Sequence, residues 1–264
     1  MTDLHQGFRG PTGTPVNELT AFLQEVDRLP GIQLVRRALA AAVRPAAGER
    51  VLDAGCGIGL QTRRLADEHP DAHVTGVDHN AELLAIAGRD PRPNLAWVRA
   101  DLNGLDLPES SFDVICTERV LMYLPDSALD GLVRLLVPGG RVALFELDYG
   151  ATMLAPGSAR DAVVMRAQAA LHAALPQPWA GRRLPRLLRD RGFTDIAARP
   201  FSFTVSEPVW RGIVLGTLQD LDRELNLWLA EQADAAARGE FVAAFTGMLC
   251  TGRRARSHAP SAAR

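Results

Sequence analysis

The sequence contains no lysine, since all 29 of its basic residues are arginine. This absence excludes a Schiff base to a lysine, pyridoxal-phosphate chemistry, the lysine of a Walker phosphate loop and a lysine general base. Arginine in place of lysine, together with abundant alanine, indicates a GC-rich genome and suggests a bacterial origin.

Net charge and cysteine are scarce as well. The formal net charge is −2 over 264 residues, which offers no electrostatic footprint for a nucleic acid. The three cysteines, Cys56, Cys116 and Cys250, lie far apart and form neither a metal-binding spacing nor a disulfide framework. We therefore expect no nucleic-acid partner and no cysteine-bound metal.

Long hydrophobic runs are also missing. No run approaches the ~20 residues that a membrane span needs, and the polar residues 2–15 lack the apolar core of a signal peptide. The length fits one α/β domain of about 200 residues with additions. We expect a cytoplasmic protein, with no membrane partner, that has a flexible arm over residues 1–16, one domain over 17–252 and a disordered tail over 253–264.

What the chain does contain is a glycine-rich segment behind a short apolar run, at residues 49–60 (E-R-V-L-D-A-G-C-G-I-G-L). The apolar run predicts a buried strand, and the amphipathic residues 61–68 predict a helix. Glycines between them tolerate backbone angles closed to other residues and let a ligand approach the main chain and the helix dipole. This order of strand, turn and helix is typical of nucleotide binding. The three glycines are Gly55, Gly57 and Gly59.

The spacing of these glycines indicates which ligand they serve. A dinucleotide fingerprint would place its third glycine where Leu60 stands, so the pattern departs from that fingerprint. Asp53, just before the turn, would repel a pyrophosphate but attract a cationic amino group. The sequence favours a positively charged ligand, and glycines that serve packing alone are the alternative.

The segment V-L-D-A-G-C-G-I-G resembles the first motif of the class I S-adenosylmethionine (SAM) methyltransferases, and L-V-P-G-G-R-V at residues 136–142 is also typical of that family. The likeness is to the broad type 11 group that includes ubiquinone and menaquinone C-methyltransferases. It implies an α/β, Rossmann-like fold with a seven-stranded, mostly parallel sheet, helices on both faces, and SAM as cofactor. It also implies cofactor contacts from the first motif, at Asp53, Gly55, Cys56, Gly57 and Gly59.

The next expected strand, residues 72–78, ends at Asp78. A carboxylate at this strand end suits the two hydroxyls of a ribose, because it can accept a hydrogen bond from each. The alternative is that Asp78 caps a helix over residues 80–87. His79, beside it, is expected to contact the cofactor.

Two further strand ends are expected to contribute to the cofactor site. After the strand at 95–100, the resemblance implies that Asp101 accepts from the adenine amino group and that the N–H of Leu102 donates to the ring. Asp101 could instead stabilise a turn. After the strand at 112–117, the backbone carbonyl at the strand end holds the cofactor's amino group in similar enzymes, which implicates Glu118 unless its side chain faces Arg119 or solvent.

Other expected elements complete the domain. Two leading helices, over 17–29 and 31–43, either help to form the substrate cavity, as in similar enzymes, or pack as a plain pair. Similar enzymes also build a substrate lid from a helical insert between the fifth and sixth strands, here residues 151–191. The remaining elements are a helix over 129–137, strands over 141–147 and 193–205, helices over 208–246 and a closing antiparallel strand over 245–251.

Methyl transfer from a sulfonium depends on positioning and exclusion of water more than on charged catalytic groups. If a proton must be removed, the candidate catalytic residues are His172 in the insert and Tyr149 and Asp148 at the sheet edge, with His5 and His79 as weaker candidates. Each has an ordinary alternative role in packing or at the surface. Asp148 and Glu118 lie on neighbouring strand ends, but without further clustered acids we expect no metal site.

The predicted function is SAM-dependent methyl transfer to an oxygen or carbon of a small, apolar or aromatic molecule, in secondary metabolism. Three alternatives stay open. They are a SAM-binding enzyme that catalyses a rearrangement or decarboxylation, an NAD(P) oxidoreductase on the same scaffold, and a regulatory SAM-binding module without turnover. A homodimer is also left open.

Overall fold

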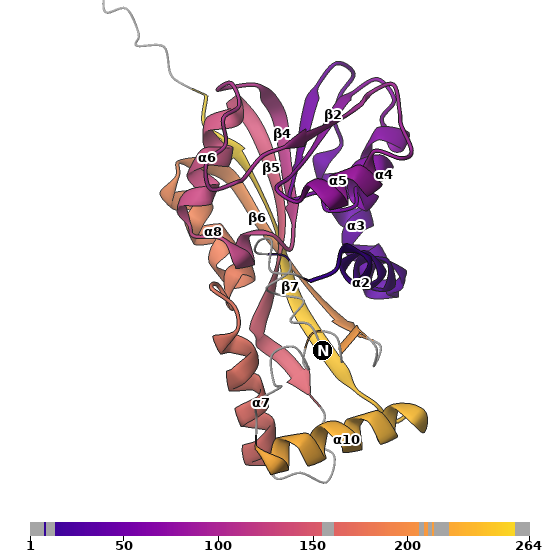
Figure 1. Ribbon diagram of the computed structural model, residues 1–264. Helices are drawn as coiled ribbons and strands as arrows, with labels where there is room; N and C mark the ends of the chain where they lie inside the picture. Colours follow the sequence, from indigo (N-terminus) through magenta and orange to yellow (C-terminus); the bar gives the residue numbers. More distant parts are fainter. Residues whose placement is uncertain are drawn as a thin grey trace, which may run out of the picture.

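The computed structural model describes residues 8, 14–154, 161–205, 209–210, 213 and 222–256. Its centre is a seven-stranded sheet in the order β3-β2-β1-β4-β5-β7-β6 (Figure 1). The first five strands run parallel, and β7 lies antiparallel between β5 and β6. The predicted Rossmann-like α/β class with a seven-stranded, mostly parallel sheet is confirmed.

The strands follow the apolar runs of the sequence. At the centre, Val51 to Ala54 are all buried because helices cover both faces of the sheet, which is usual for parallel strands. The strands are β1 Arg50–Ala54, β2 His73–Asp78, β3 Leu95–Arg99, β4 Phe112–Glu118, β5 Leu136–Leu154, β6 Phe193–Thr204 and β7 Ala243–Arg254.

The helices begin where their sequences supply a start signal. Pro30 stands at the first position of α3, and the side chains of Asn80 and Asp222 cap α5 and α10 by accepting from backbone N–H groups. The helical elements are α2 Val16–Arg28, α3 Pro30–Val43, α4 Leu60–Glu68, α5 Ala81–Ala87, the 3₁₀ turn η1 Leu121–Tyr123, α6 Ser127–Leu135, α7 Asp161–Ala173, α8 Ala180–Asp190 and α10 Arg223–Ala237.

Helices lie on both sides of the sheet, with α3 and α4 on one side and α6 and α8 on the other (Figure 1). Two apolar cores result. Leu39 and Leu65 belong to the core beneath α3 and α4, whereas Leu132 and Leu188 belong to the core beneath α6 and α8. Each of these four helices therefore buries its apolar stripe against one face of the sheet.

At two places the structure has a strand where the sequence predicted the end of a helix. The helix expected over 129–137 ends at Leu135, because Leu136 pairs with Phe112 and begins β5. Residues 243–246, expected to be helical, belong to β7, where Ala243 pairs with Leu154. In both places pairing with a strand distant in sequence decides the conformation.

The ends of β5, β6 and β7 run beyond the parallel strands and, with α7 and α10, form a distal lobe (Figure 1). Its core holds Trp210 and Trp228, whose rings meet edge to face at 5.7 Å. The expected insert 151–191 therefore comprises the end of β5, then α7 in the distal lobe and α8 against the sheet. Its role as a substrate lid stays a prediction.

The expected arm and tail fall mostly outside the described residues. Phe8 is described, and its ring lies 6.1 Å from that of Phe22 and 6.2 Å from that of Tyr123. At the other end, Arg253 and Arg254 belong to β7 and pair with β6, so the strand reaches beyond the predicted boundary. Across the described residues, every helix is too short or too polar to span a membrane.

Candidate functional site

The glycine turn between β1 and α4 demands glycine for two reasons. Gly55, Gly57 and Gly59 have φ values of 79°, 55° and 74°, in the left-handed region that side chains disfavour. Space is also short, because a Cβ on Gly55 would lie 2.4 Å from Val120 Cγ2 and one on Gly59 would lie 2.3 Å from Trp97 Cη2. The turn packs against the end of β2, where the N–H groups of Gly55 and Cys56 donate to the carbonyl oxygen of Val77 at 2.7 and 2.9 Å.

Asp78, at the end of β2, braces this turn. Its Oδ2 accepts from the N–H of Gly57 at 2.8 Å, and its Oδ1 accepts from the N–H of Asn80 at 2.9 Å. Asn80, not Asp78, caps α5, so the alternative role of Asp78 as a helix cap is not what the structure shows. The Asp78 carboxylate also lines a cavity beside the turn. Its contact with a ribose there stays a prediction.

A cavity of about 170 Å³ opens beside the turn, at the carboxyl ends of the parallel strands. Its walls come from α2, the ends of β2, β4 and β5, η1, and the segment after β3. Apolar and aromatic side chains dominate, including those of Phe22, Leu83, Met122, Tyr123, Leu124, Leu147 and Tyr149. Its acidic and arginine side chains are those of Asp78, Asp101, Glu118 and Arg119.

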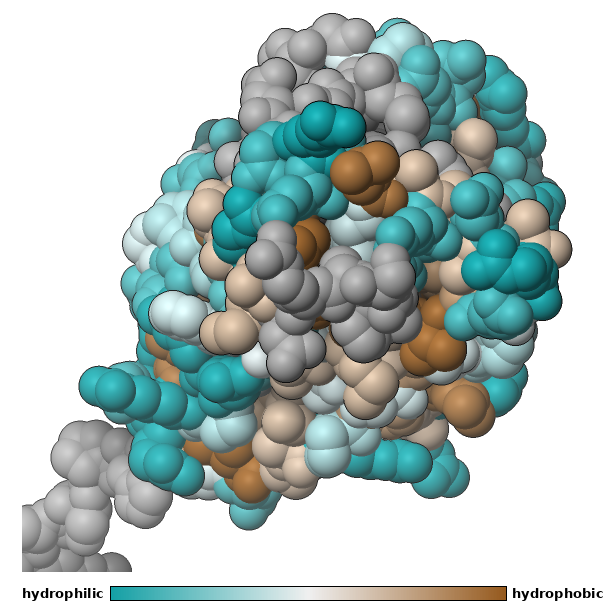
Figure 2. Space-filling model, turned by 90° about the horizontal axis from the view of Figure 1, so that it is seen from below, coloured by the Kyte–Doolittle hydropathy of each residue, from teal (hydrophilic) through white to brown (hydrophobic). Residues whose placement is uncertain are grey.

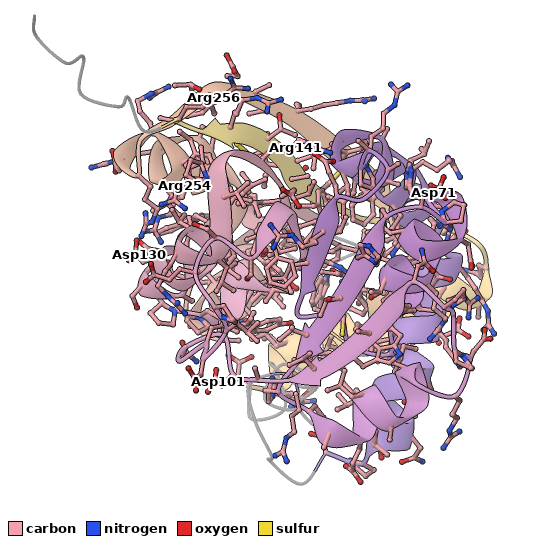
Figure 3. The ribbon with its side chains drawn as sticks, turned by 90° about the horizontal axis from the view of Figure 1, so that it is seen from above. Asp71, Asp101, Asp130, Arg141, Arg254 and Arg256 are labelled. Carbon is pink, nitrogen blue, oxygen red and sulfur yellow. The ribbon has the colours of Figure 1, made fainter. Side chains whose placement is uncertain are left out.

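Asp101 and Leu102 line the cavity in the segment that follows β3. Oδ1 of Asp101 accepts from the backbone N–H of Asn103 at 2.9 Å, so the carboxylate does stabilise a turn. Figure 3 shows Asp101 on the opposite side of the molecule from Arg254 and Arg256. Adenine recognition by Asp101 and Leu102 stays a prediction, and the observed turn leaves it open.

A second, smaller hollow of about 50 Å³ lies behind the turn and shares Gly55, Gly57, Glu118 and Arg119 with the first. Its lining also contains Asp53, Cys56, Arg36 and Gln61. The Oε1 atom of Gln61 is buried and has no hydrogen-bond partner among the described residues. A hollow with two carboxylates, two guanidinium groups and an unpaired amide oxygen suits a ligand that carries both charges.

Glu118 is the centre of a buried ion network. Nε of Arg36 donates to its Oε2 at 2.8 Å, and Nη2 of Arg119 donates to its Oε1 at 2.9 Å. Arg36, which is only 4% exposed, also pairs with Asp27. Burial raises the pKa of Glu118, but the two guanidinium groups outweigh it and lower the pKa below the ordinary value. Glu118 is therefore ionised and faces both arginines.

Asp53 and Cys56 line the second hollow. Asp53 is 3% exposed, and its Oδ2 accepts from Thr62 Oγ1 at 2.6 Å. Burial raises the pKa of Asp53 to about 6, and it also raises the pKa of the Cys56 thiol. His79 lines the larger cavity, where its buried Nε2 has no hydrogen-bond partner in the described part of the chain.

The three predicted catalytic residues occupy different places. Tyr149 is 2% exposed and lines the cavity. His172 lies behind it, with Nε2 donating to the carbonyl oxygen of Tyr149 at 2.8 Å, so that nitrogen carries a proton and is not available as a base. Asp148 is held by Arg182, whose Nη2 donates to Oδ1 at 2.9 Å. His5 lies outside the described residues.

Three side chains in and behind the site were not predicted from the sequence: Arg36, Gln61 and Glu146. Arg36 and Glu146 each interrupt an apolar face, since Arg36 lies among Ile32, Val35 and Leu39 and Glu146 lies in the strand V-A-L-F-E-L. A charged residue on an otherwise buried face was the available signal. Within the described residues, no three His, Cys, Asp or Glu side chains cluster as metal ligands.

Comparisons of the sequence and of the fold both find methyltransferases among the similar proteins. A family profile described as a methyltransferase domain matches residues 51–140. The trans-aconitate 2-methyltransferase of Methylobacterium radiotolerans is 35% identical over 194 residues, covering 73% of this chain and 69% of that protein. The same enzyme of Azoarcus sp. (strain BH72) is 42% identical over 96 residues, covering 36% of this chain and 37% of that protein.

In the corresponding enzyme of Deinococcus radiodurans the match is 33% identical and covers 54% of this chain and 47% of that protein. The chain thus spans less than half the length of two of these relatives. Among solved structures, Haemonchus contortus phosphoethanolamine N-methyltransferase 2 in complex with SAM has a TM-score of 0.60 at 17% identity, covering 96% of this chain and 60% of that one. The [4+2]-cyclase SpnF has a TM-score of 0.55 at 22% identity, covering 85% and 82%.

Proposed function

Because the chain belongs to the class I S-adenosylmethionine-dependent methyltransferases, we propose that it transfers the SAM methyl group to an oxygen or carbon of a small apolar or aromatic acceptor. SAM is the cofactor of this family. The observation that carries the proposal is the junction of the two hollows, where a turn suited to a nucleoside opens directly into an apolar, aromatic cavity. We further propose a bacterial setting in secondary metabolism.

The residues present fit SAM. The main chain of Gly55 and Gly57, which lines the cavity, and the carboxylate of Asp78 would hold the ribose, while Asp101 and Leu102 would hold the adenine. The Nε2 atom of His79 supports the fit, because a buried polar atom needs a hydrogen-bond partner and the described residues do not supply one.

The second hollow fits the amino-acid part of the cofactor. An α-ammonium group needs carboxylate or carbonyl acceptors, which Asp53, Glu118 and the unpaired Oε1 of Gln61 offer. An α-carboxylate needs donors, which Arg36 and Arg119 offer. When bound, the cofactor supplies a methyl group on a positively charged sulfur.

The protein's own contribution is then positioning and exclusion of water. Positioning can lower the activation free energy by ~7 to 11 kcal/mol, because the loss of translational and rotational freedom and the solvent reorganisation occur before the reaction. Holding donor and acceptor in line accounts for several of these kcal/mol. Tyr149, buried in the cavity wall, is the proposed residue that orients the acceptor or covers the sulfonium by a cation–π contact. His172 and Asp148 are proposed to support Tyr149 from behind.

The charges of the cavity support an acceptor with little negative charge. Arg119 is the one arginine in its described lining, and Glu118 already pairs with it. Asp78 and Asp101 add negative charge. A polycarboxylate such as trans-aconitate, named in several relatives, would meet net repulsion, so it is the second candidate acceptor and rests on those names alone.

The test is an assay with SAM and two sets of acceptors, neutral aromatic or apolar compounds and trans-aconitate, with mass detection of S-adenosylhomocysteine. We expect turnover with a member of the neutral set and none with trans-aconitate. Turnover of trans-aconitate alone would contradict the proposed acceptor class. A changed acceptor without S-adenosylhomocysteine would favour the non-methylating alternative, for which the fold likeness to a cyclase is the supporting observation.

A further inference from the structure

Glu146 is a buried carboxylate that the proposed chemistry does not use. It lies in the middle of β5, has no exposed surface, and does not line either hollow. Its neighbours Phe145 and Leu147 belong to the apolar core. Burying an ionisable group among apolar side chains is costly unless hydrogen bonds compensate, so its contacts indicate what it does.

Those contacts converge on η1. Oε1 of Glu146 accepts from the backbone N–H of Val120 at 3.0 Å and of Leu121 at 2.9 Å, and Oε2 accepts from that of Met122 at 3.2 Å. Thr117 Oγ1, 3.4 Å from Oε1, adds a fourth and longer contact. The N–H groups of a first helical turn have no partner within the helix, and here one carboxylate takes three in succession.

The residues held in this way form one wall of the site. Val120, Met122 and Tyr123 line the cavity, and Val120 also packs against the glycine turn, within 2.4 Å of where a Cβ on Gly55 would lie. The carbonyl of Met122 accepts from the N–H of Gln177 at 3.1 Å, which joins the same wall to the segment before α8. A shift of η1 would therefore move the acceptor wall and the cofactor turn together.

We propose that Glu146 is a positioning residue whose carboxylate sets the distance between the glycine turn and the acceptor wall by gripping the backbone of residues 120–122. It acts through η1 and touches neither ligand. The inference rests on the proposed function for its consequence in catalysis. The grip itself is a property of the protein that can be measured without turnover.

The test compares the full chain with its Glu146→Gln variant. The replacement is nearly isosteric but puts an NH₂ group against backbone N–H donors. We expect amide hydrogen exchange in residues 119–124 to become at least ten-fold faster, while exchange in β1 and β2 stays unchanged. We also expect S-adenosylhomocysteine, used as the probe, to bind at least three-fold more weakly by calorimetry. A general loss of stability would instead raise exchange throughout the sheet.

Two further variants make the result decisive. Glu146→Asp keeps the charge on a shorter side chain and should restore part of the protection, and Thr117→Val should cause a smaller loss at the same residues if the Gln variant does not fold. Glu49 lies just before β1 and pairs with Arg141, so Glu49→Gln is the matched control and should leave residues 119–124 unchanged.

Unchanged exchange at residues 119–124 in folded Glu146→Gln, or equal loss in Glu49→Gln, would overturn the proposal. If the wild-type protein makes no methylated product but the exchange pattern holds, the proposed function fails and the positioning role stands.

Discussion

Asp53 and Glu146 are two buried acids whose raised pKa values make the stability of the fold depend on pH. Burial is the largest cause in both, and it raises the pKa of Asp53 to about 6 and of Glu146 to about 7. Backbone N–H donors oppose it at Glu146, and Thr62 opposes it at Asp53. Both groups therefore bind protons more tightly in the folded chain than in the unfolded one.

This sign predicts a fall in stability with rising pH. The stabilising contribution of a raised pKa is complete below the ordinary value of 4.5 for Glu146 and is lost as pH rises through about 7. Glu146→Gln should remove up to roughly 3 kcal/mol of that decline in urea unfolding measured between pH 5 and 8. Glu49, whose pKa is lowered chiefly by Arg141, has the opposite sign, so Glu49→Gln should leave the decline in place. An unaltered slope in Glu146→Gln would contradict the assignment.

Asp78 supplies a second prediction at this scale. Because one oxygen of Asp78 holds the glycine turn at Gly57 and the other holds the N–H of Asn80, Asp78→Ala should weaken SAM binding by about 1 to 3 kcal/mol in calorimetry. Asp71→Ala is the control, since Asp71 precedes β2, at the opposite end of that strand from Asp78, and lines neither hollow. Equal affinity of Asp78→Ala and wild type would mean that the ribose is held elsewhere.

At the scale of elements, the link between α3 and β4 depends on one buried arginine. Arg36→Met leaves Asp27 and Glu118 without that partner, and breaking a buried pair from one side costs roughly 3 to 5 kcal/mol. Thermal unfolding should show a clear fall in Tm. Arg37→Met, at the exposed neighbouring position, should change it little. Similar melting of the two variants would refute the anchoring role.

The elements also show what could and could not be read from the sequence. The helix over 31–43 and the strands at 72–78 and 95–100 were predicted nearly to the residue, because their apolar periodicity is local. Glu118, one of the two partners of Arg36, lies 82 residues away, so no local pattern could reveal that pair.

β5 was predicted over 141–147 because Pro138-Gly-Gly looked like a boundary. It runs from Leu136 to Leu154 because strands on either side supply hydrogen-bond partners. The glycine turn could be predicted from the sequence, because its backbone conformation requires glycine at Gly55, Gly57 and Gly59. The residues that position the acceptor could not be predicted, because a positioning role has no characteristic sequence motif.

At the scale of the whole molecule, ligand binding should stabilise the fold, because the proposed cofactor site joins the ends of β1, β2 and β4. A ligand at 100 times its Kd adds about 2.7 kcal/mol to the free energy of unfolding, and each kcal/mol raises Tm by roughly 2 to 4 °C in a chain of this size. We expect SAM and S-adenosylhomocysteine to raise Tm and NAD(P) to leave it unchanged. A rise with NAD(P) alone would favour the oxidoreductase.

The lower face of the molecule bears on the homodimer left open above. Figure 2 shows this face from below. Its hydrophobic residues, drawn in brown, form separate spots among hydrophilic ones drawn in teal. Exposed large apolar side chains of the distal lobe include Met153, Met165 and Leu227. Scattered exposed apolar residues are normal on a monomer, so the described surface does not call for a second copy.

The length of β5 has a consequence for anyone who wishes to re-engineer the acceptor. A single strand, whose register with β7 shifts after Asp148, carries Glu146, Asp148 and Tyr149 from the end of the sheet beside the glycine turn into the distal lobe. Transplanting that lobe from a homologue would therefore need three splices, in β5, β6 and β7, each placed on the lobe side of Tyr149. Splices placed nearer the glycine turn would exchange Tyr149 and Glu146 together. A change in acceptor selectivity could then not be assigned to either residue.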